Sequence, residues 1–289
     1  MYVDTLPSSP AVSAAKSMGM RGRAELGFEA TGDQTRLKHL FQTSPLRVLF
    51  PAMPKPELNT AVLVTTSGGL VGGDRLEIEV TASENARALV MGQAAEKVYR
   101  SLGPDTLFNS NLIVKDQAFL EWLPQETIVF DQSRLHRTTR IDIADTGQFT
   151  GAEMLVFGRT AMGERLHTGL VRDVWDIRQN GKRLWADALH LDGDITAKLD
   201  HPAGFDGARA VATFIHVSPD AEKHLEFARS LLDQDGDVRT GVTMTNSVLV
   251  ARWLAKDTLK LRSSFGNFWA AFRAHTQNLP GRMPRLWHV

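Results

Sequence analysis

The chain has 289 residues, of which 43% are apolar, and its 33 Lys and Arg residues balance its 33 Asp and Glu residues. This length allows a substantial buried core, and the balanced charge gives no overall field to attract nucleic acid, an anionic membrane or a highly charged substrate. The chain contains no cysteine, which excludes disulfides, thiolate nucleophiles, iron–sulfur clusters and Cys-ligated zinc. We therefore expect a globular protein of the cytoplasm that binds neither nucleic acid nor a membrane.

The first 22 residues are rich in Pro and small residues. They lack the apolar core of about 7–15 residues that marks a signal peptide. No run in the chain approaches the roughly 18 consecutive apolar residues of a membrane-spanning helix. We expect a disordered arm over residues 1–22, followed by a single domain over residues 23–289.

From Arg23 to about Ile215, short segments that alternate apolar and polar residues are separated by Gly, Pro, Asn and Asp. This alternation predicts strands, for example over residues 76–80, 112–114, 119–123, 127–130 and 140–143. Because the strands follow one another without intervening helices, a doubly wound parallel sheet is disfavoured, and we predict a mostly antiparallel body. Asn180-Gly181 predicts a two-residue hairpin turn, since both residues tolerate positive φ.

Two segments in the C-terminal third have helical periodicity. The first covers residues 219–232, with Ser218 before it as a potential N-cap and Pro219 at the first helical position. Residues 257–276 begin with Asp257, a second potential cap, and place aromatic residues three and four positions apart. Residues 242–255, between the two predicted helices, have the composition of further strand. The helices are therefore expected to belong to the β architecture and not to a separate domain.

The stretch TTSGGLVGGD, over residues 65–74, raises the question of a phosphate-binding loop. A dinucleotide fingerprint needs a helix after the glycines, whereas an alternating strand follows here, and a P-loop needs a Lys-Ser or Lys-Thr that is absent. We interpret the stretch as a strand connection in which glycines adopt positive φ and Asp74 binds backbone amides. Its four glycines, Gly68, Gly69, Gly72 and Gly73, also indicate close packing of backbone on backbone.

At this loop the sequence resembles the urease accessory protein D family, UreD, called UreH in some organisms. The family signature has the form TxGGLVGGDxL, and residues 66–76 read TSGGLVGGDRL. The likeness continues in family order over about 260 residues, through GQAAEKVYRS, LPQETIVF, FGRTAMGE, LVRDVWDIRQNGKRLW, VLVARWLA and PRLWHV.

This resemblance implies an all-β-dominated fold: a right-handed β-superhelix of many short strands with two α-helices in the C-terminal third. It implies no enzymatic activity and a role in nickel insertion into apo-urease, as a metallochaperone scaffold. The family binds UreF, which recruits the GTPase UreG, and the assembly docks on urease. Nickel is then expected to pass in transit through an internal tunnel, with no tightly bound cofactor.

The residues offer few ligands for tight metal binding, because the nine histidines form no HxH, HxxxH or HExxH pattern. Within the blocks that resemble the family, the candidate groups for a transient nickel path are Asp74, Glu126 and Glu164. Candidates for the tunnel or for its structural motif are the four glycines together with Gln93, Lys97 and Tyr99. Each has an alternative interpretation: a turn cap for Asp74, exposed strand positions for Gln93 and Lys97, a loop charge for Glu126 and a surface ion pair for Glu164.

Phe268, Trp269 and Phe272 lie at helical spacing and could form a surface that binds UreF. The alternative is that they face the core of their own domain, as apolar residues at this spacing usually do. Two other functions stay open: a purely structural adaptor between UreF and urease, and a carbohydrate-active β-protein that uses two carboxylates.

Overall fold

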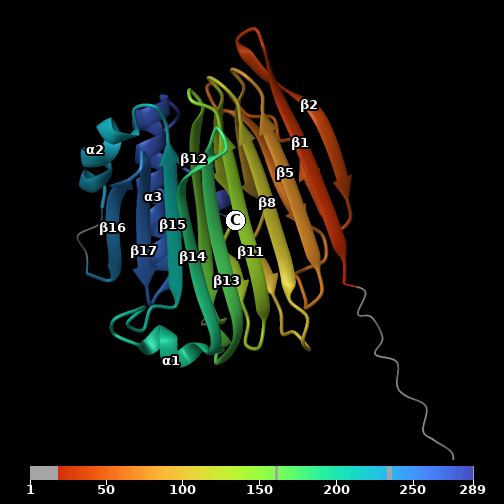
Figure 1. Cartoon of the computed structure of the whole chain (residues 1–289), viewed down its shortest axis with the longest axis vertical. Helices are drawn as coiled ribbons and strands as arrows, with labels where there is room; N and C mark the ends of the chain where they lie inside the picture. Colours follow the sequence, from red (N-terminus) through yellow and green to blue (C-terminus); the bar gives the residue numbers. More distant parts are fainter. Residues whose placement is uncertain (1–18, 160–161, 233–235, 289) are drawn as a thin grey trace, which may run out of the picture.

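The computed structural model describes residues 19–159, 162–232 and 236–288. Two facing sheets account for most of this part of the chain (Figure 1). Sheet A contains, in spatial order, β14 (Lys182–Asp194), β13 (Thr168–Gln179), β11 (Arg134–Ile143), β8 (Thr106–Val114), β5 (Arg75–Ala82), β1 (Arg21–Thr31) and β2 (Gln34–Thr43). Sheet B contains β16 (Val238–Thr245), β17 (Val248–Ala255), β15 (Ala210–Val217), β12 (Gln148–Phe157), β9 (Phe119–Leu123), β6 (Arg87–Gly92), β4 (Asn59–Thr65) and β3 (Leu46–Leu49). Two short strands extend it, since β10 (Thr127–Val129) pairs with β12 and β7 (Glu96–Val98) pairs with β10.

The chain winds between the two sheets. β4, β6, β9 and β12 pair in parallel in sheet B, while β5, β8, β11 and β13 alternate with them along the sequence and pair in parallel in sheet A. The result is a solenoid of about four stacked turns. The β-superhelix implied by the resemblance is thus confirmed.

The expectation of a mostly antiparallel body is wrong for these central strands. Apart from the short β7 and β10, each of these strands before β13 is followed in the sequence by a strand of the opposite sheet, so consecutive strands do not become sheet neighbours. Parallel pairing then needs no helical crossover, because the return strand provides it. Antiparallel pairing occurs toward the two ends, as in β1–β2 and β15–β17–β16. It also joins β13 to β14 through Asn180 and Gly181, at φ 49° and 76°, which confirms the predicted hairpin.

Two apolar layers stabilise this arrangement. The inward-facing residues of both sheets form the first layer, which includes Leu26, Val80, Leu112 and Trp122. The second layer lies between the outer face of sheet B and the helix α3 (Thr258–Gln277). Sheet A has no helix on its outer face in the described part of the chain, and its strands alternate buried and exposed positions there.

The helix predictions are confirmed for α3 and need correction for the first segment. Asp257 caps α3 by accepting hydrogen bonds from the amides of Leu259 and Lys260 at 2.8 and 3.2 Å. Residues 219–232 instead form a 3₁₀ turn (Ala221–His224) followed by the short α2 (Leu225–Ser230). Ser218 is not the cap, because its hydroxyl donates to Asp220 and lies 3.0 Å from the buried His216 ring.

Two short helical elements were not predicted: α1 (Ile195–Asp200) and a 3₁₀ turn (Arg285–His288). α1 lies below the sheets in Figure 1, whereas α2 lies beside β16. No helix among the described residues is long and apolar enough to cross a membrane. Of the arm predicted over residues 1–22, residues 1–18 lie outside the described residues, and β1 already begins at Arg21. The single domain over residues 23–289 stays a prediction.

Candidate functional site

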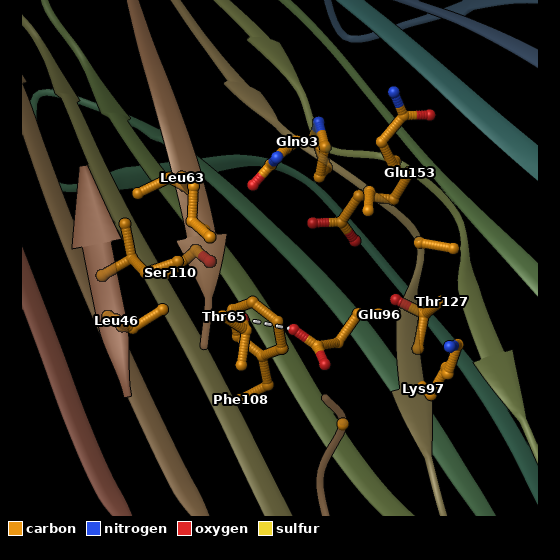
Figure 2. Close-up of a pocket in the computed structure, with 18 of the residues that line it drawn as sticks. Leu46, Leu63, Thr65, Gln93, Glu96, Lys97, Phe108, Ser110, Thr127 and Glu153 are labelled. Atoms are coloured by element: carbon orange, nitrogen blue, oxygen red, sulfur yellow. Dashed lines mark hydrogen bonds between the residues drawn. The ribbon is translucent and has the colours of Figure 1, made fainter. Parts of the chain in front are cut away.

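A cavity of about 190 Å³ lies between the two sheets at the middle of the solenoid. Its exposed lining residues, which mark the mouth, are Gly68, Gln93, Ala94 and Lys97. Its buried lining residues, which mark the floor, include Ser110, Trp122, Thr127, Arg137 and Glu153. The cavity has room for several water molecules, and its hydroxyl and carboxylate groups can bind them. Figure 2 labels lining residues that come from both sheets, among them Ser110 of sheet A and Thr127 and Glu153 of sheet B.

Glu96, on β7, is the first carboxylate inward from the mouth. Its Oε2 accepts a hydrogen bond from the Thr65 hydroxyl at 2.5 Å, drawn as a dashed line in Figure 2. Burial raises the pKa of Glu96, and the Thr65 hydrogen bond and the Lys97 charge oppose that rise only in part. Glu96 is therefore a carboxylate whose charge is incompletely compensated, and a cation that enters the cavity would stabilise it.

A buried ionic cluster forms the floor. Arg137, on β11, donates from Nε and Nη2 to the two carboxylate oxygens of Asp173, on β13, at 2.8 and 2.7 Å. Its Nη1 donates to the Thr127 hydroxyl at 3.0 Å. This two-point contact is the strongest geometry available to an Arg–carboxylate pair. The pKa of Arg137 is raised: burial opposes its charge, but Asp173 and Glu153 more than offset that effect.

Glu153, on β12, faces this cluster across the space between the sheets. Its Oε1 accepts hydrogen bonds from the Thr139 hydroxyl at 2.5 Å and from the Trp122 indole at 3.3 Å. Its Oε2 lies 3.2 Å from Nε of Arg137. That N–H points to Asp173, so Oε2 has no hydrogen-bond partner within the described part of the chain.

The protonation of Glu153 reflects this incomplete pairing. Burial raises its pKa to about 7, and the nearby Asp173 charge adds to the rise, whereas Arg137 and the two hydrogen bonds oppose it. A carboxyl group with a pKa near neutrality can lose its proton to water when a cation binds and regain a proton when the cation leaves. Glu153 is the group in the cavity best suited to transient cation binding.

A second cavity, of about 230 Å³, lies further along the solenoid. Glu153 lines both cavities, and Asp173 and Asp187 line the second. Polar side chains therefore follow one another between the sheets from the mouth at Lys97 through Glu153 to the second cavity.

Among the described residues, no group of three or more His, Asp or Glu side chains is arranged to hold a metal ion.

The glycine-rich loop forms one wall of the first cavity. Leu70 is buried, and its amide and carbonyl pair with the Lys97 carbonyl and the Tyr99 amide at 2.7 and 2.8 Å. Gly69 has φ 143°, and a Cβ there would lie 2.4 Å from the Tyr99 ring and 2.9 Å from the Lys97 carbonyl oxygen. A Cβ on Gly72 would lie 2.5 Å from the Pro104 carbonyl oxygen. These glycines allow backbone to pack on backbone, as their spacing predicted.

Asp74, the first carboxylate predicted for a nickel path, lies outside the lining of the cavity. It is buried, and its two oxygens accept hydrogen bonds from the amides of Met20 and Val71 at 2.7 and 2.8 Å. Both oxygens are thus used to fix the turn, as in the alternative interpretation. Gly73 sits beside it at φ 97°, where a side chain would be strained.

The other two predicted carboxylates also lie outside the lining of the first cavity and form ion pairs. Glu126 pairs with Arg262 of α3, close to the C-terminal segment, where Arg262 donates to the Trp287 carbonyl at 2.6 Å. Glu164 pairs with Arg159 and accepts a hydrogen bond from the Asp131 amide at 3.1 Å.

The remaining predicted residues divide into two groups. Gln93 and Lys97 line the mouth, and the Tyr99 hydroxyl donates to the Gly68 carbonyl at 3.3 Å beside it. Phe268, Trp269 and Phe272 are buried, and all three pack edge-on against Phe214 of sheet B. In this conformation the three rings belong to the core and present no surface to a partner.

Sequence reasoning missed Arg137, Glu153 and Asp173. A signal was present in the strand alternation, since Arg137 occupies the inward phase with Leu135 and Ile141. Glu153 likewise interrupts the apolar strand β12. A charged residue in phase with core residues requires a buried partner and is a candidate for function.

Two sheets wound as a solenoid around an apolar core, with a cavity in it that two carboxylates line, define a β-solenoid protein with an internal cavity. The family model described as UreD urease accessory protein matches residues 20–288. The chain is 44% identical over 277 residues to the urease accessory protein UreD of Magnetococcus marinus, covering 94% of this chain and 96% of that relative. It is 39% identical over 289 residues to UreD of a Methylobacterium species, covering 98% of this chain and all of that relative. The chain belongs to the UreD family of urease accessory proteins.

Proposed function

We propose that this protein takes part in nickel insertion into apo-urease and that nickel travels through its interior. In this proposal it binds UreF in the cytoplasm, UreF recruits UreG, and the assembly docks on urease. Its role is non-catalytic, since it transfers a cation without making or breaking a covalent bond. Family membership supports the accessory role, and the position of Glu153 in both cavities is the observation that carries the conduit.

The chemistry of the interior suits transit better than storage. Nickel accepts nitrogen and oxygen donors, and the interior offers carboxylates, hydroxyls and room for water. Glu96 and Glu153 each hold an incompletely compensated carboxylate, so each can attract the cation without a closed set of ligands. Asp173 is already bound at both oxygens by Arg137, so it holds the cation weakly. A path of single weak ligands lets the cation move on.

The test replaces Glu153 and monitors assembly and nickel transfer separately. Glu153→Gln keeps the shape and removes the charge, and Glu153→Leu fills the junction with apolar atoms. Each variant is co-expressed with the urease subunits and the other accessory proteins, and the nickel content of purified urease is measured. We expect nickel incorporation to fall at least about tenfold while UreF and urease still co-purify with the variant.

Glu226→Gln provides the control, because Glu226 is an exposed carboxylate that lines neither cavity. Full nickel incorporation by both Glu153 variants in an assembled complex would refute the conduit and favour a purely structural adaptor. Deletion of the gene in its host tests the wider role, since abundant apo-urease without nickel is expected. Unchanged holo-urease in the deletion strain would refute the accessory function itself.

A further inference from the structure

Two segments that are far apart in the sequence meet beside the first cavity. Residues 124–126 connect β9 to β10, and residues 284–288 follow α3 and contain the 3₁₀ turn. They lie in two of the blocks that resemble the family, LPQETIVF and PRLWHV. Pro124 and Gln125 line the cavity, whereas residues 284–288 do not. The contact between the two segments therefore joins the cavity wall to a part of the chain outside it.

Arg262, on α3, makes this contact. Its Nη1 donates to the Gln125 side-chain oxygen at 3.1 Å and to the Glu126 carboxylate, and its Nη2 donates to the Trp287 carbonyl at 2.6 Å. The side-chain nitrogen of Gln125 donates to the Leu286 carbonyl at 2.8 Å. Both polar ends of this buried amide are thus bonded to groups outside the cavity lining, which fixes the side chain.

Trp287 anchors residues 284–288 on α3. Its ring is buried, the Arg262 guanidinium lies over it at 4.5 Å, and the Phe265 ring packs against it with centroids 5.5 Å apart. Gly266 makes room for the indole, because a Cβ at that position would lie 3.3 Å from Nε1 of Trp287. A glycine weakens a helix interior, so the docking of this ring gives a reason for Gly266 within α3.

The wall that Arg262 holds supports two charged groups of the cavity. The Glu126 carbonyl accepts a hydrogen bond from the Glu96 amide at 2.9 Å, and the Thr127 hydroxyl accepts one from Arg137 at 3.0 Å. β7 and β10 have three residues each, and they pair with each other. Strands this short make few hydrogen bonds and open easily unless other parts of the fold hold them. Arg262 supplies such support from α3.

We infer that Arg262 is a positioning residue that, together with residues 284–288, braces the wall of the first cavity. This brace keeps Glu96 and Arg137 in place, although Arg262 itself does not line the cavity. The inference rests on the proposed function, since it assigns a residue outside the path to the transfer of nickel. Glu126 neutralises Arg262, so the brace adds no unpaired positive charge beside the path of a cation.

The first experiment follows hydrogen–deuterium exchange of the full chain by mass spectrometry. Arg262→Gln removes the guanidinium and with it the contacts to Glu126 and Trp287. We expect amide exchange in residues 92–98 and 124–130 to rise at least about tenfold, while exchange in β5 and β8 of sheet A stays unchanged.

Arg87→Gln is the matched control. Arg87 also joins α3 to sheet B, because it donates to Gln277 at 3.2 and 3.4 Å and lies over the Phe119 ring at 5.2 Å. It lines neither cavity. We therefore expect Arg87→Gln to leave exchange in residues 92–98 and 124–130 unchanged.

The second experiment measures the nickel content of urease co-expressed with each variant and the other accessory proteins. We expect Arg262→Gln to lower nickel incorporation at least about tenfold, as replacement of a residue that orients a ligand commonly does. Arg262→Lys keeps the charge beside Glu126 but lacks the planar group that also reaches the Trp287 carbonyl, so it should restore part of the loss. Arg87→Gln should allow full incorporation, and UreF and urease should co-purify with all three variants.

The possible results separate the brace from the proposed function. Unchanged exchange in residues 92–98 and 124–130 of Arg262→Gln would refute the brace, and a rise spread evenly over the described strands would assign Arg262 to overall stability instead. A local rise with full nickel incorporation would refute the role of Arg262 in transfer if the Glu153 variants lower incorporation. Full incorporation by the Glu153 variants as well would refute the conduit, and the role of Arg262 in transfer would fall with it.

Discussion

Replacement of Arg273 tests how α3 is held on sheet B. Arg273 is only 1% exposed, and it donates from Nε and Nη2 to both oxygens of Glu121, on β9, at 3.0 Å each. It also contacts Glu57 at 3.1 and 3.2 Å and the carbonyls of Pro280 and Arg282. One guanidinium thus joins the helix, the sheet, the loop before β4 and the segment after α3.

Arg273→Met removes the charge but keeps much of the apolar volume. Glu121, which is fully buried, and Glu57 would then lack their cation. Breaking a buried ion pair from one side costs about 3–5 kcal/mol, a large share of the roughly 5–15 kcal/mol that stabilises a typical domain. Burial already raises the pKa of Glu121, so in the variant it should take up a proton more readily. The loss of stability should therefore be smaller at pH 5 than at pH 8.

The assay is urea denaturation followed by circular dichroism, with the free energy of unfolding compared between variants. Arg229→Met is the control, because its salt bridge with Glu226 is exposed and should contribute less than about 1 kcal/mol. Adding Glu121→Gln to Arg273→Met should recover part of the loss, since the unpaired charge is then gone. A cost below about 1 kcal/mol for Arg273→Met, or a further loss on adding Glu121→Gln, would refute this account.

Two further predictions concern the cavity and the glycine loop. The folded-state pKa of Glu153, about 7, lies above its ordinary 4.5, so the folded protein holds a proton that the unfolded chain releases, and stability falls as pH rises between these values. Glu153→Gln cannot titrate and so lacks this effect. Its unfolding free energy, measured relative to that of the unmodified chain, should therefore rise by up to about 3 kcal/mol from pH 4.5 to pH 8. A difference in unfolding free energy that does not change with pH would contradict the raised pKa of Glu153. Gly69→Ala should cost about 3 kcal/mol in urea denaturation, since it meets Tyr99 and the Lys97 carbonyl. Gly68→Ala, with φ 74° but open space around it, should cost only about 1 kcal/mol, and equal costs would contradict the packing argument.

The local part of the fold was predictable because it depends on neighbouring residues. The Asn180-Gly181 turn, the Asp257 cap and the alternating strands follow from backbone preferences and periodicity. Which strands pair could not be derived in this way, because strand alternation is the same whether the next strand lies in the same sheet or in the opposite one. The superhelix was therefore predicted only through the resemblance to a family.

The candidate site was predictable at its mouth and not at its floor. Gln93 and Lys97 lie in a contiguous block that resembles the family, and they do line the cavity. The floor joins Arg137, Glu153 and Asp173 from three strands of two sheets, so their proximity depends on the winding of the chain. Periodicity marks Arg137 and Asp173 as inward-facing, and Glu153 interrupts an apolar strand, but neither signal indicates which of these residues meet.

The two buried ionic clusters differ in a way that separates structure from function. Around Arg273, bonds to both carboxylates and to two carbonyls compensate the charges, and the cluster lies under a helix outside both cavity linings. Around Arg137, one oxygen of Glu153 is left without a hydrogen bond, and that residue lines both cavities. An unpaired buried oxygen costs stability, and an apolar residue of similar size would avoid that cost. The cost is offset only when something binds there, so the incompletely paired cluster is the one suited to a passing cation.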